Sequence, residues 1–367
     1  MGSAVGPGAS QRIVLAVSED VAMCGRDDGP ARDFQRLAEI TGAAVVGNSG
    51  QTVRFLPVSR FGRAAALDIS QAVHVIRAYP DADAYVSFSE RIGLPLAMLL
   101  RLRRSRPAHI MIAHRLNSRA KRLLDGAVRW RRGVDRVVTL CTAQRQHAER
   151  IVPGASVFIR QGVDSRYYHP LDSEEEDYVL SVGSESRDYE TLVSAILEAG
   201  LKLKILSSSP WCRKRRVMPR GSPDRVELLD RVDYGALRDL YQRARVVVVP
   251  LCDVDYAAGL NGVLEGFSVN KPIIVSNSRG IADYVSHLRN AYVVPVSDVD
   301  AMAAALGTVY SDALLREELK RGGKESVLEY ANLDSYVGRL KLEIGMAIEA
   351  REANLHYPGR QKQKGSS

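Results

Sequence analysis

Residues 246–267 read VVVVPLCDVDYAAGLNGVLEGF, and they carry the clearest indication of the fold class. Four consecutive valines end at Pro250, as expected for a strand buried on both faces of a parallel sheet. A loop of small residues then leads to Gly259, after which apolar side chains recur at helical spacing. The stretch therefore predicts a strand, a short loop and a helix, which together form the repeating unit of an α/β protein.

The same alternation of short apolar strands with longer helical segments runs through most of the chain. The strand candidates are Arg12–Val17, Ala43–Gly47, Ala84–Phe88, His109–Ala113, Arg136–Leu140 and Ser156–Arg160 in the first half, and Tyr178–Val182, Lys202–Ser207, Val226–Leu229, Val246–Pro250, Pro272–Ser276 and Ala291–Val294 in the second. Because the alternation occurs in both halves, we expect two Rossmann-like, doubly wound α/β domains. Their active site would lie in a cleft where the carboxyl ends of the two sheets face each other.

Domain boundaries follow from the acidic, turn-rich segment 172–177, which is the expected linker. We predict one domain over residues 12–170 and a second over residues 175–330. A helix is predicted at about residues 333–353, and the polar tail 356–367 is predicted to be disordered.

Composition excludes several classes of protein. A chain of 367 residues is too long for one ordinary core, and 46% hydrophobic with 26% charged residues rules out a disordered chain. The longest clean apolar run, residues 92–100, is far shorter than the roughly 20 residues of a membrane span. Four scattered cysteines without a C-x-x-C pair, and a start unlike a signal peptide, predict a cytoplasmic protein.

The net charge of +8 is concentrated in one segment. Residues 101–136 contain 12 Lys and Arg against 2 Asp and Glu, a local balance of +10. Within this segment, residues 117–132 have helical apolar spacing and a basic opposite face. That face is either a solvated outer surface or a docking surface for an anionic membrane or a phosphorylated acceptor. Nucleic acid is not expected, because no aromatic-interleaved basic motif is present.

Two strand-to-helix loops are candidate phosphate sites. The loop entering Gly259 presents backbone N–H groups and a helix N-terminus, and Glu265 follows two turns later, within reach of a ribose diol. The loop after Gly183 contains Arg187, whose guanidinium can grip phosphate oxygens. The alternatives are an ordinary crossover with a surface glutamate, and a surface arginine paired with a neighbouring carboxylate.

Several short strings support a family assignment in combination. They are Gln161–Asp164 with Tyr168–Pro170, Val179–Gly183 with Arg187–Leu192, Leu237–Tyr241, Gly259–Glu265 and Asn290–Val294. Together they resemble the donor half of GT-B retaining glycosyltransferases, the family 4-like or group 1 enzymes that include glycogen-synthase-like and mannosyltransferase-like members. The resemblance covers about residues 135–340, and it implies that the C-terminal helix crosses back onto the first domain.

The resemblance implies roles for individual residues. On the donor side, the binding residues that it implies are Gly183, Ala258, Gly259, Leu260, Glu265 and Val232. Among them, Glu265 would hold the ribose, and the backbone at Ala258 and Gly259 would receive the diphosphate. Residues 226–232 would contact the edge of the base. It further implies Arg187 as the phosphate cation, His114 beside the transferred sugar, and Gly25 and Arg26 in an acceptor-side loop. Two positions depart from the family: Ala257 stands where a first glutamate is expected, and Ser184 stands where many members have arginine.

The activity implied is transfer of a sugar from a UDP- or GDP-sugar to an acceptor that the sequence does not identify, whether a lipid-linked glycan, a polysaccharide or a small natural product. The resemblance implies retention of configuration by front-face displacement. No metal or cofactor is expected, because neither Asp81-Ala-Asp83 nor Asp253-Val-Asp255 has a convincing metal-site context. A non-catalytic homologue acting as a binding or partner subunit, which the two departures favour, and a sugar-nucleotide epimerase are the alternatives.

Overall fold

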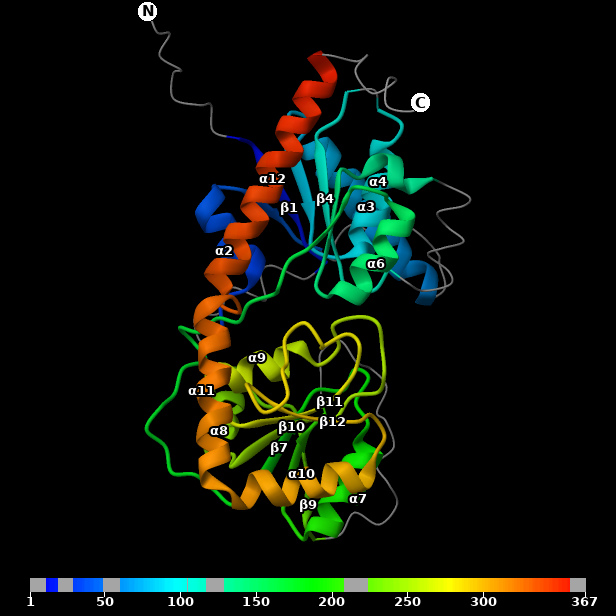
Figure 1. Ribbon diagram of the computed structural model, residues 1–367. Helices are drawn as coiled ribbons and strands as arrows, with labels where there is room; N and C mark the ends of the chain where they lie inside the picture. Colours follow the sequence, from blue (N-terminus) through cyan, green and yellow to red (C-terminus); the bar gives the residue numbers. More distant parts are fainter. Residues whose placement is uncertain are drawn as a thin grey trace, which may run out of the picture.

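The computed structural model describes residues 11–18, 29–48, 60–103, 105–116, 129–207 and 224–356. Two six-stranded, fully parallel sheets lie one above the other, each flanked by helices (Figure 1). The predicted fold class, two Rossmann-like α/β domains, is confirmed. Each of the twelve predicted strands is present, because a run of β-branched residues is stable where both faces of the sheet are covered, whereas the apolar run 92–100 lies in a helix.

The first sheet has the strand order β2-β1-β3-β4-β5-β6. Its strands are β1 Ile13–Ala16, β2 Ala44–Val46, β3 Ala84–Ser87, β4 Ala108–Ala113, β5 Arg136–Thr139 and β6 Ser156–Phe158. The helices of this half are α2 Asp33–Thr41, α3 Arg60–Ala78, α4 Glu90–Leu100, the 3-10 turn η2 Trp130–Gly133 and α6 Thr142–Ile151. Helix α2 packs on one face of the sheet, and α3 and α4 pack on the other.

The second sheet has the order β12-β11-β10-β7-β8-β9. Its strands are β7 Val179–Val182, β8 Leu203–Leu206, β9 Val226–Leu229, β10 Val246–Val249, β11 Ile273–Ser276 and β12 Tyr292–Val294. The accompanying helices are α7 Tyr189–Ala199, α8 Tyr234–Arg243, α9 Leu260–Ser268, α10 Val299–Ser311 and α11 Ala313–Glu329.

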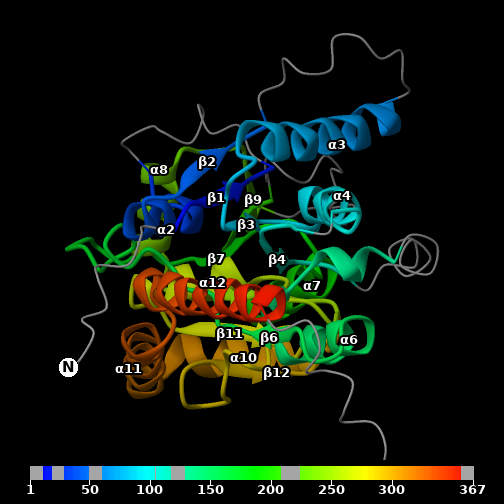
Figure 2. The same ribbon diagram turned by 90° about the horizontal axis from the view of Figure 1, so that it is seen from above.

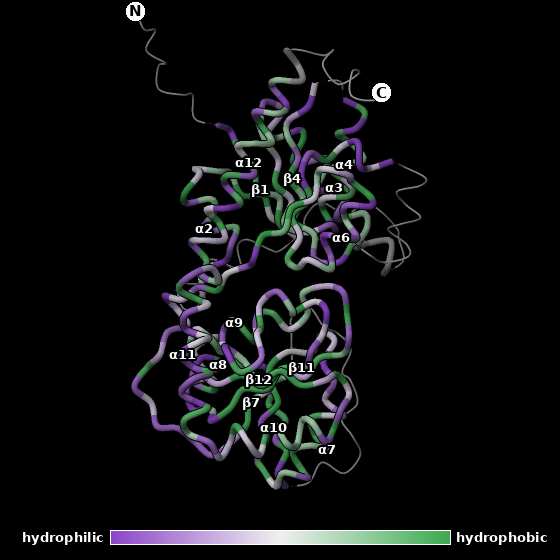
Figure 3. The backbone as a smooth tube through the Cα atoms, in the orientation of Figure 1, coloured by the Kyte–Doolittle hydropathy of each residue, from purple (hydrophilic) through white to green (hydrophobic). Residues whose placement is uncertain are grey.

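The four valines of β10 show why this sheet needs helices on both sides. Val247 and Val249 belong to the core cluster formed with α8 and α9, whereas Val246 and Val248 belong to the opposite cluster formed with α7 and α10. All four are at most 1% exposed. Burial of a valine side chain contributes roughly 1.5 to 3 kcal/mol, so the alternating strand ties both layers to the sheet. Figure 3 shows the same pattern as hydrophobic strands inside a more hydrophilic shell.

The last helix, α12 Leu333–His356, lies along the first sheet rather than the second (Figures 1 and 2). Tyr336, Leu340 and Ile344 are at most 1% exposed and share a core cluster with β1, β3 and β4. Arg136 on β5 also pairs with Glu343 on this helix, Nε to Oε2 at 3.3 Å. The chain therefore returns from the second half to complete the core of the first.

The strand orders locate the place where loops diverge. In the second sheet β7 and β10 are neighbours, and β8 and β11 lie on opposite sides of this pair. The loops that leave the carboxyl ends of β7 and β10 therefore lead to helices on opposite faces of the sheet, α7 and α9. Ligands of open α/β sheets bind at such a switch point. The first sheet has the corresponding switch between β1 and β3.

Candidate active site

The loops after β7 and β10 form one bonded unit. The Asp188 N–H donates to the carbonyl of Pro250 at 3.0 Å, and the Cys252 N–H donates to the carbonyl of Ser186 at 2.9 Å. Arg187 and Leu251 also form an isolated antiparallel bridge. These bonds fix the two candidate phosphate loops relative to each other, although 63 residues separate them along the chain from Arg187 to Pro250.

Gly183 and Gly259 each need a backbone that only glycine adopts readily. Their φ angles are +102° and +80°, in the left-handed region. A Cβ on Gly183 would lie 2.5 Å from Nη2 of Arg187, and a Cβ on Gly259 would lie 2.7 Å from Cδ2 of Leu251. Ala258 and Leu260 beside this glycine are buried, at 4% and 2% exposed.

Arg187 lies beneath these loops, where it is 6% exposed. Its Nε and Nη2 donate to the carbonyl of Val182 at 3.2 and 2.9 Å, and its Nη1 donates to the carbonyl of Glu185 at 2.9 Å. Burial lowers its pKa from the usual value. The predicted phosphate cation is therefore a buried positive charge that also shapes the loop around Gly183, and it is not the surface residue that was the alternative.

Glu265 projects from α9 and is half-buried. The Tyr241 hydroxyl on α8 donates to its Oε2 at 2.9 Å. Burial raises the pKa of Glu265 to about 7, while the Tyr241 hydrogen bond and the charge of Arg32 oppose that rise. Glu265 is therefore not a simple surface glutamate, and it lies close enough to Arg187 for their charges to interact.

Two tyrosines complete the surroundings of Glu265. The rings of Tyr168 and Tyr241 meet edge to face, with centroids 6.4 Å apart. Tyr168 is 2% exposed, and its pKa is raised by burial first and by the Glu265 charge second. The sequence motifs contained both tyrosines but gave no sign that their side chains lie beside one carboxylate, since the three residues come from separate elements.

His114 stands at the carboxyl end of β4, and its loop is held by a residue that sequence reasoning missed. Glu90, at the start of α4 and 6% exposed, accepts hydrogen bonds from the backbone N–H groups of His114 and Arg115, both at 3.0 Å. The His114 Nε2–H donates to the carbonyl of Phe88 at 3.0 Å. A buried carboxylate thus fixes the backbone of the loop, and a second contact fixes the ring.

The loop after β10 reaches the first half of the molecule. The guanidinium carbon of Arg115 lies 5.0 Å from the ring centroid of Tyr256, and the Cys141 thiol donates to the carbonyl of Asp255 at 3.7 Å. Ala257 packs against the core clusters of both halves. The position where the family has its first glutamate is thus an apolar contact between the domains.

A second contact crosses between the halves near Glu265. Arg32, which precedes α2, donates to the Tyr234 hydroxyl at the start of α8, and its guanidinium carbon lies 5.5 Å from the centroid of that ring. Gly29 packs against the same ring, because a Cβ there would lie 2.9 Å from Cδ2 of Tyr234. The charge of Arg32 acts on Glu265, so this segment of the first half lies near that carboxylate.

The remaining predicted residues are less closely associated. Val232 is half-buried in the loop after β9, the edge strand of the second sheet. Asp253 of the Asp253-Val-Asp255 motif pairs with Arg279, Nε to Oδ2 at 3.1 Å. The acceptor-side residues predicted from the resemblance, Gly25 and Arg26, lie outside the described residues, as do residues 117–128 of the predicted basic helix.

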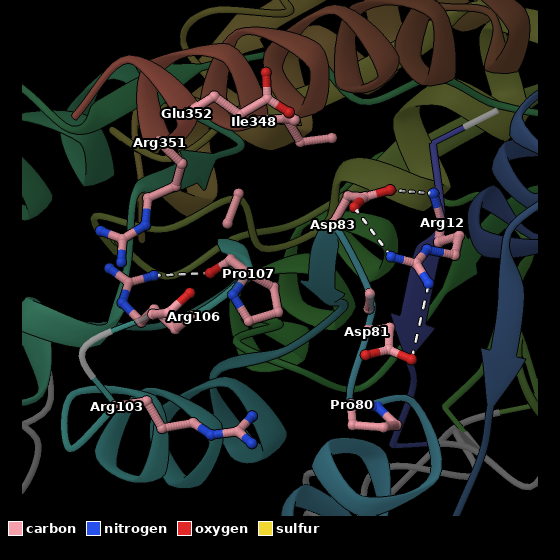
Figure 4. Close-up of a pocket in the computed structure, with 13 residues that line it drawn as sticks. Arg12, Pro80, Asp81, Asp83, Arg103, Arg106, Pro107, Ile348, Arg351 and Glu352 are labelled. Atoms are coloured by element: carbon pink, nitrogen blue, oxygen red, sulfur yellow. Dashed lines mark hydrogen bonds and ion pairs between the residues drawn. The ribbon is translucent and has the colours of Figure 1, made fainter. Parts of the chain in front are cut away.

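A cavity of about 340 Å³ lies at the opposite, amino-terminal ends of β1, β3 and β4, under the end of α12 (Figure 4). Its charged groups are largely paired with carboxylates. Arg12 pairs with Asp81 and Asp83, while Arg106 pairs with Asp135 at 2.6 Å. These ion pairs anchor strand ends, so the cavity does not compete with the loops described above as the candidate active site.

Two searches of the described residues concern other kinds of site. Within the described part of the chain, no three His, Cys, Asp or Glu side chains gather in a group that could hold a metal ion. No helix among those residues combines the length and the apolar character needed to cross a membrane.

Comparison with known proteins gives the family. Residues 187–312 match the model of the family Glycosyl transferases group 1. These residues form a group 1 glycosyltransferase domain. The family predicted from the sequence motifs is thereby confirmed, and so is the prediction of a transferase. A search of curated protein sequences gave no significant match.

Solved structures show that the whole transferase has the GT-B fold. Sucrose-phosphate synthase from Thermosynechococcus elongatus is 16% identical with a TM-score of 0.75, and the match covers 93% of this chain and 100% of that one. α,α-Trehalose 6-phosphate synthase from Burkholderia multivorans is 13% identical with a TM-score of 0.71, covering 95% and 99%. HepE from Anabaena in complex with UDP-glucose is 13% identical with a TM-score of 0.66, covering 92% and 99%.

In this glycosyltransferase the predicted donor-side residues are unevenly distributed. Gly183, Arg187, Gly259 and Glu265 come together around the switch point of the second sheet. His114 lies at the carboxyl end of β4, and its neighbour Arg115 contacts Tyr256 in the loop after β10. The signal for the missed Glu90 was present only as a carboxylate at the first position of a helix, which is common and therefore uninformative.

Proposed function

We propose that this glycosyltransferase moves a sugar from a nucleoside-diphosphate donor, UDP- or GDP-linked, to an acceptor held by the first domain. The observation that carries the proposal is the convergence of Gly183, Arg187, Gly259 and Glu265 at the switch point of the second sheet. This arrangement offers backbone donors and positive charge for a diphosphate, with a carboxylate beside them for a ribose diol. HepE, which has the same fold, binds UDP-glucose.

The loop backbone suits a diphosphate for a physical reason. Helix α9 begins after Gly259, so its first N–H groups lack partners within the helix, and the helix dipole adds partial positive charge. Arg187 lies under the same loop, with Nη1 only 3.2 Å from where a Cβ on Gly259 would be. A diphosphate lying on this loop would meet N–H donors at its surface and a buried guanidinium behind them.

Glu265 suits a diol because it is an acceptor with a fixed orientation. Its Oε2 is held by the Tyr241 hydroxyl at 2.9 Å, which orients the carboxylate. The ionised carboxylate accepts hydrogen bonds from ribose hydroxyls, and such charge-assisted bonds are stronger than neutral ones. Burial raises the pKa of Glu265 to about 7. A bound diol donates hydrogen bonds to the ionised carboxylate and would therefore favour that form.

The proposed chemistry is a front-face displacement with retention. The acceptor oxygen bonds to the anomeric carbon as the bond from that carbon to the β-phosphate oxygen breaks. The electron pair of the broken bond stays on the leaving nucleoside diphosphate, and the acceptor proton passes to a β-phosphate oxygen. The protein orients the two substrates and stabilises the charge on the diphosphate. The proposal includes neither a metal ion nor a protein nucleophile.

Binding of nucleotide sugars tests the donor assignment directly. Saturation-transfer NMR against UDP-glucose, GDP-mannose and ADP-glucose should show transfer to both base and sugar protons for one of them. Glu265→Gln should weaken binding of that donor about tenfold, since one charge-assisted hydrogen bond is lost. Glu198→Gln, on the exposed surface of α7, is the matched control and should bind as the wild type does. Absence of binding by the wild type to any nucleotide sugar would refute the proposal.

Two further measurements test the mechanism once a donor is known. The anomeric configuration of the product, read from its proton coupling constant, should match that of the donor. Turnover should be the same with excess EDTA as with added Mg²⁺. An inverted product would contradict front-face displacement, and loss of turnover in EDTA would contradict metal independence.

We further propose that the basic segment attaches the first domain peripherally to an anionic membrane. Leu102, after the end of α4, is 73% exposed and lies between the exposed Arg101 and Arg103. The exposed Arg131 and Arg132 of η2 are close, because η2 packs against α4 at Ala97. An apolar side chain among arginines suits the interface of anionic lipids. The protein should therefore co-sediment with phosphatidylglycerol vesicles at 20 mM salt and detach at 500 mM; no co-sedimentation at low salt would end this proposal.

A further inference from the structure

We propose that Arg115 is a catalytic residue which the first domain contributes to the leaving diphosphate. The inference rests on the proposed function and adds to it a cation that the sequence comparison did not identify. Arg115 belongs to the first domain, in the loop that follows β4.

The position of Arg115 is defined from two sides. Its backbone N–H donates to Oε1 of Glu90 at 3.0 Å, so the carboxyl end of β4 is fixed by a carboxylate that is 6% exposed. Its guanidinium carbon lies 5.0 Å from the ring centroid of Tyr256, in the loop after β10. An exposed arginine of the first domain is thus directed to the donor loops of the second.

Tyr256 connects this guanidinium to the other donor loop. Its hydroxyl lies 2.7 Å from Oγ of Ser186, in the loop after β7. Ser186 has a φ of +51°, a left-handed conformation uncommon for serine, which the surrounding hydrogen bonds stabilise. Tyr256 therefore stands where the two phosphate loops meet, and Arg115 over its ring is at the entrance to that junction.

Arg187 and Arg115 would act from different directions. Arg187 is buried under the loops, with three of its N–H donors on the carbonyl groups of Val182 and Glu185. It contributes charge from behind the loops. Arg115 is exposed and lies against the ring of Tyr256, and from this position we expect its guanidinium to stabilise the diphosphate oxygens as they gain charge.

The step that Arg115 assists is the breaking of the bond between the anomeric carbon and the β-phosphate oxygen. The electron pair goes to the diphosphate, the acceptor oxygen takes the anomeric carbon, and the acceptor proton goes to a β-phosphate oxygen. Arg115 neither gives up nor takes a proton in this step; it lowers the energy of the diphosphate charge. Because Arg115 belongs to the first domain, it can stabilise the charge on the diphosphate only while the two domains are in contact.

Chemical rescue provides the test, with the nucleotide sugar that binds best in the NMR panel as substrate and water as acceptor. Release of nucleoside diphosphate should fall 100- to 1,000-fold in kcat for Arg115→Ala, with a smaller change in KM, because the contact is strongest in the transition state. Millimolar guanidinium should restore part of the lost rate. Arg115→Lys should retain more activity than Arg115→Ala, and Arg145→Ala, an exposed arginine on α6 of the same domain, should match the wild type.

Three results would overturn the inference: a kcat for Arg115→Ala within threefold of that for Arg145→Ala, equal activity of the Lys and Ala variants at position 115, or no rescue by guanidinium. Thermal unfolding of each variant separates a loss of rate from a loss of fold. In all three cases the wild type still releases nucleoside diphosphate, so the proposed function stands and only the role of Arg115 fails. A wild type that neither binds nor cleaves any nucleotide sugar contradicts the proposed function itself.

Discussion

Replacing Gly259 by alanine tests the structure at the loop that carries the proposed function. The φ of Gly259 is +80°, and a new Cβ would lie 2.7 Å from Cδ2 of Leu251 and 2.9 Å from Cγ1 of Val249. The Leu251 tip can move, but Val249 is a buried β-branched residue in a central strand and is stiff. The substitution therefore forces either the loop or β10 to shift.

The magnitude follows from two independent costs. A left-handed conformation costs an alanine roughly 1 to 2 kcal/mol relative to glycine, and overpacking a close contact costs roughly 1 to 3 kcal/mol. Gly262→Ala, three residues further along, is the matched control because its new Cβ would meet nothing closer than 3.7 Å. In a helix, alanine is favoured over glycine by up to about 1 kcal/mol, so this control should be neutral or stabilising.

Scanning calorimetry measures the difference. For a domain of this size, about 3 kcal/mol lowers the unfolding temperature by roughly 6 to 12 °C, so Gly259→Ala should unfold well below both the wild type and Gly262→Ala. It should also weaken binding of the nucleotide sugar at least tenfold, because the shifted loop no longer presents its N–H groups together. If the two variants unfold within about 2 °C of each other, the left-handed conformation assigned to Gly259 is wrong.

Three more predictions concern pH and the contact between the domains. The pKa of buried His109 is lowered to about 4 from 6.5, so between these values the unfolded state binds the proton more readily than the folded state. The first domain should therefore lose stability, by up to about 3 kcal/mol, as pH falls through that window. In urea unfolding, His109→Asn should reduce the dependence of the unfolding free energy on pH. The pKa of Glu265 is instead raised to about 7 from 4.5, so between these values the folded state binds the proton more readily than the unfolded state. The second domain should therefore lose stability as pH rises through that window. If the unfolding free energy of Glu265→Gln depends on pH as that of the wild type does, this prediction is wrong. Asp283 accepts hydrogen bonds from the backbone N–H and Oγ1 of Thr142, at 2.7 and 2.6 Å, and so caps a helix of the other domain. Asp283→Ala should lower the unfolding free energy by about 1 kcal/mol and increase the radius of gyration in small-angle scattering. Asp298→Ala, which removes a cap within one domain, should leave the radius unchanged.

The fold was predictable because its signal is local. The valines of β10 are continuous in sequence, and only a sheet covered on both faces buries all four. The glycine before α9 marks the turn from strand to helix, and its left-handed φ is the conformation that glycine permits. Burial and backbone geometry at these positions follow from the residue types and their order.

Part of the candidate site was predictable for the same reason, and part was not. Gly183, Arg187 and Gly259 lie in loops that are predicted where the sequence changes from a strand pattern to a helix pattern. Glu90 was missed because its function is to accept from the backbone N–H groups of His114 and Arg115, on a separate strand end 24 residues away. No local pattern encodes a contact of that kind.

The sequence by itself determined the layers of the protein, the loops at the switch point and the family, because periodicity, glycine positions and short motifs are properties of neighbouring residues. The tertiary structure decided which charges work together. It placed Arg187 beneath the loops instead of at their surface, surrounded Glu265 with two tyrosines, and brought Arg115 across to Tyr256. The pKa of a carboxylate and the direction of a guanidinium depend on burial and on groups distant in sequence, and these exist only once the chain has folded.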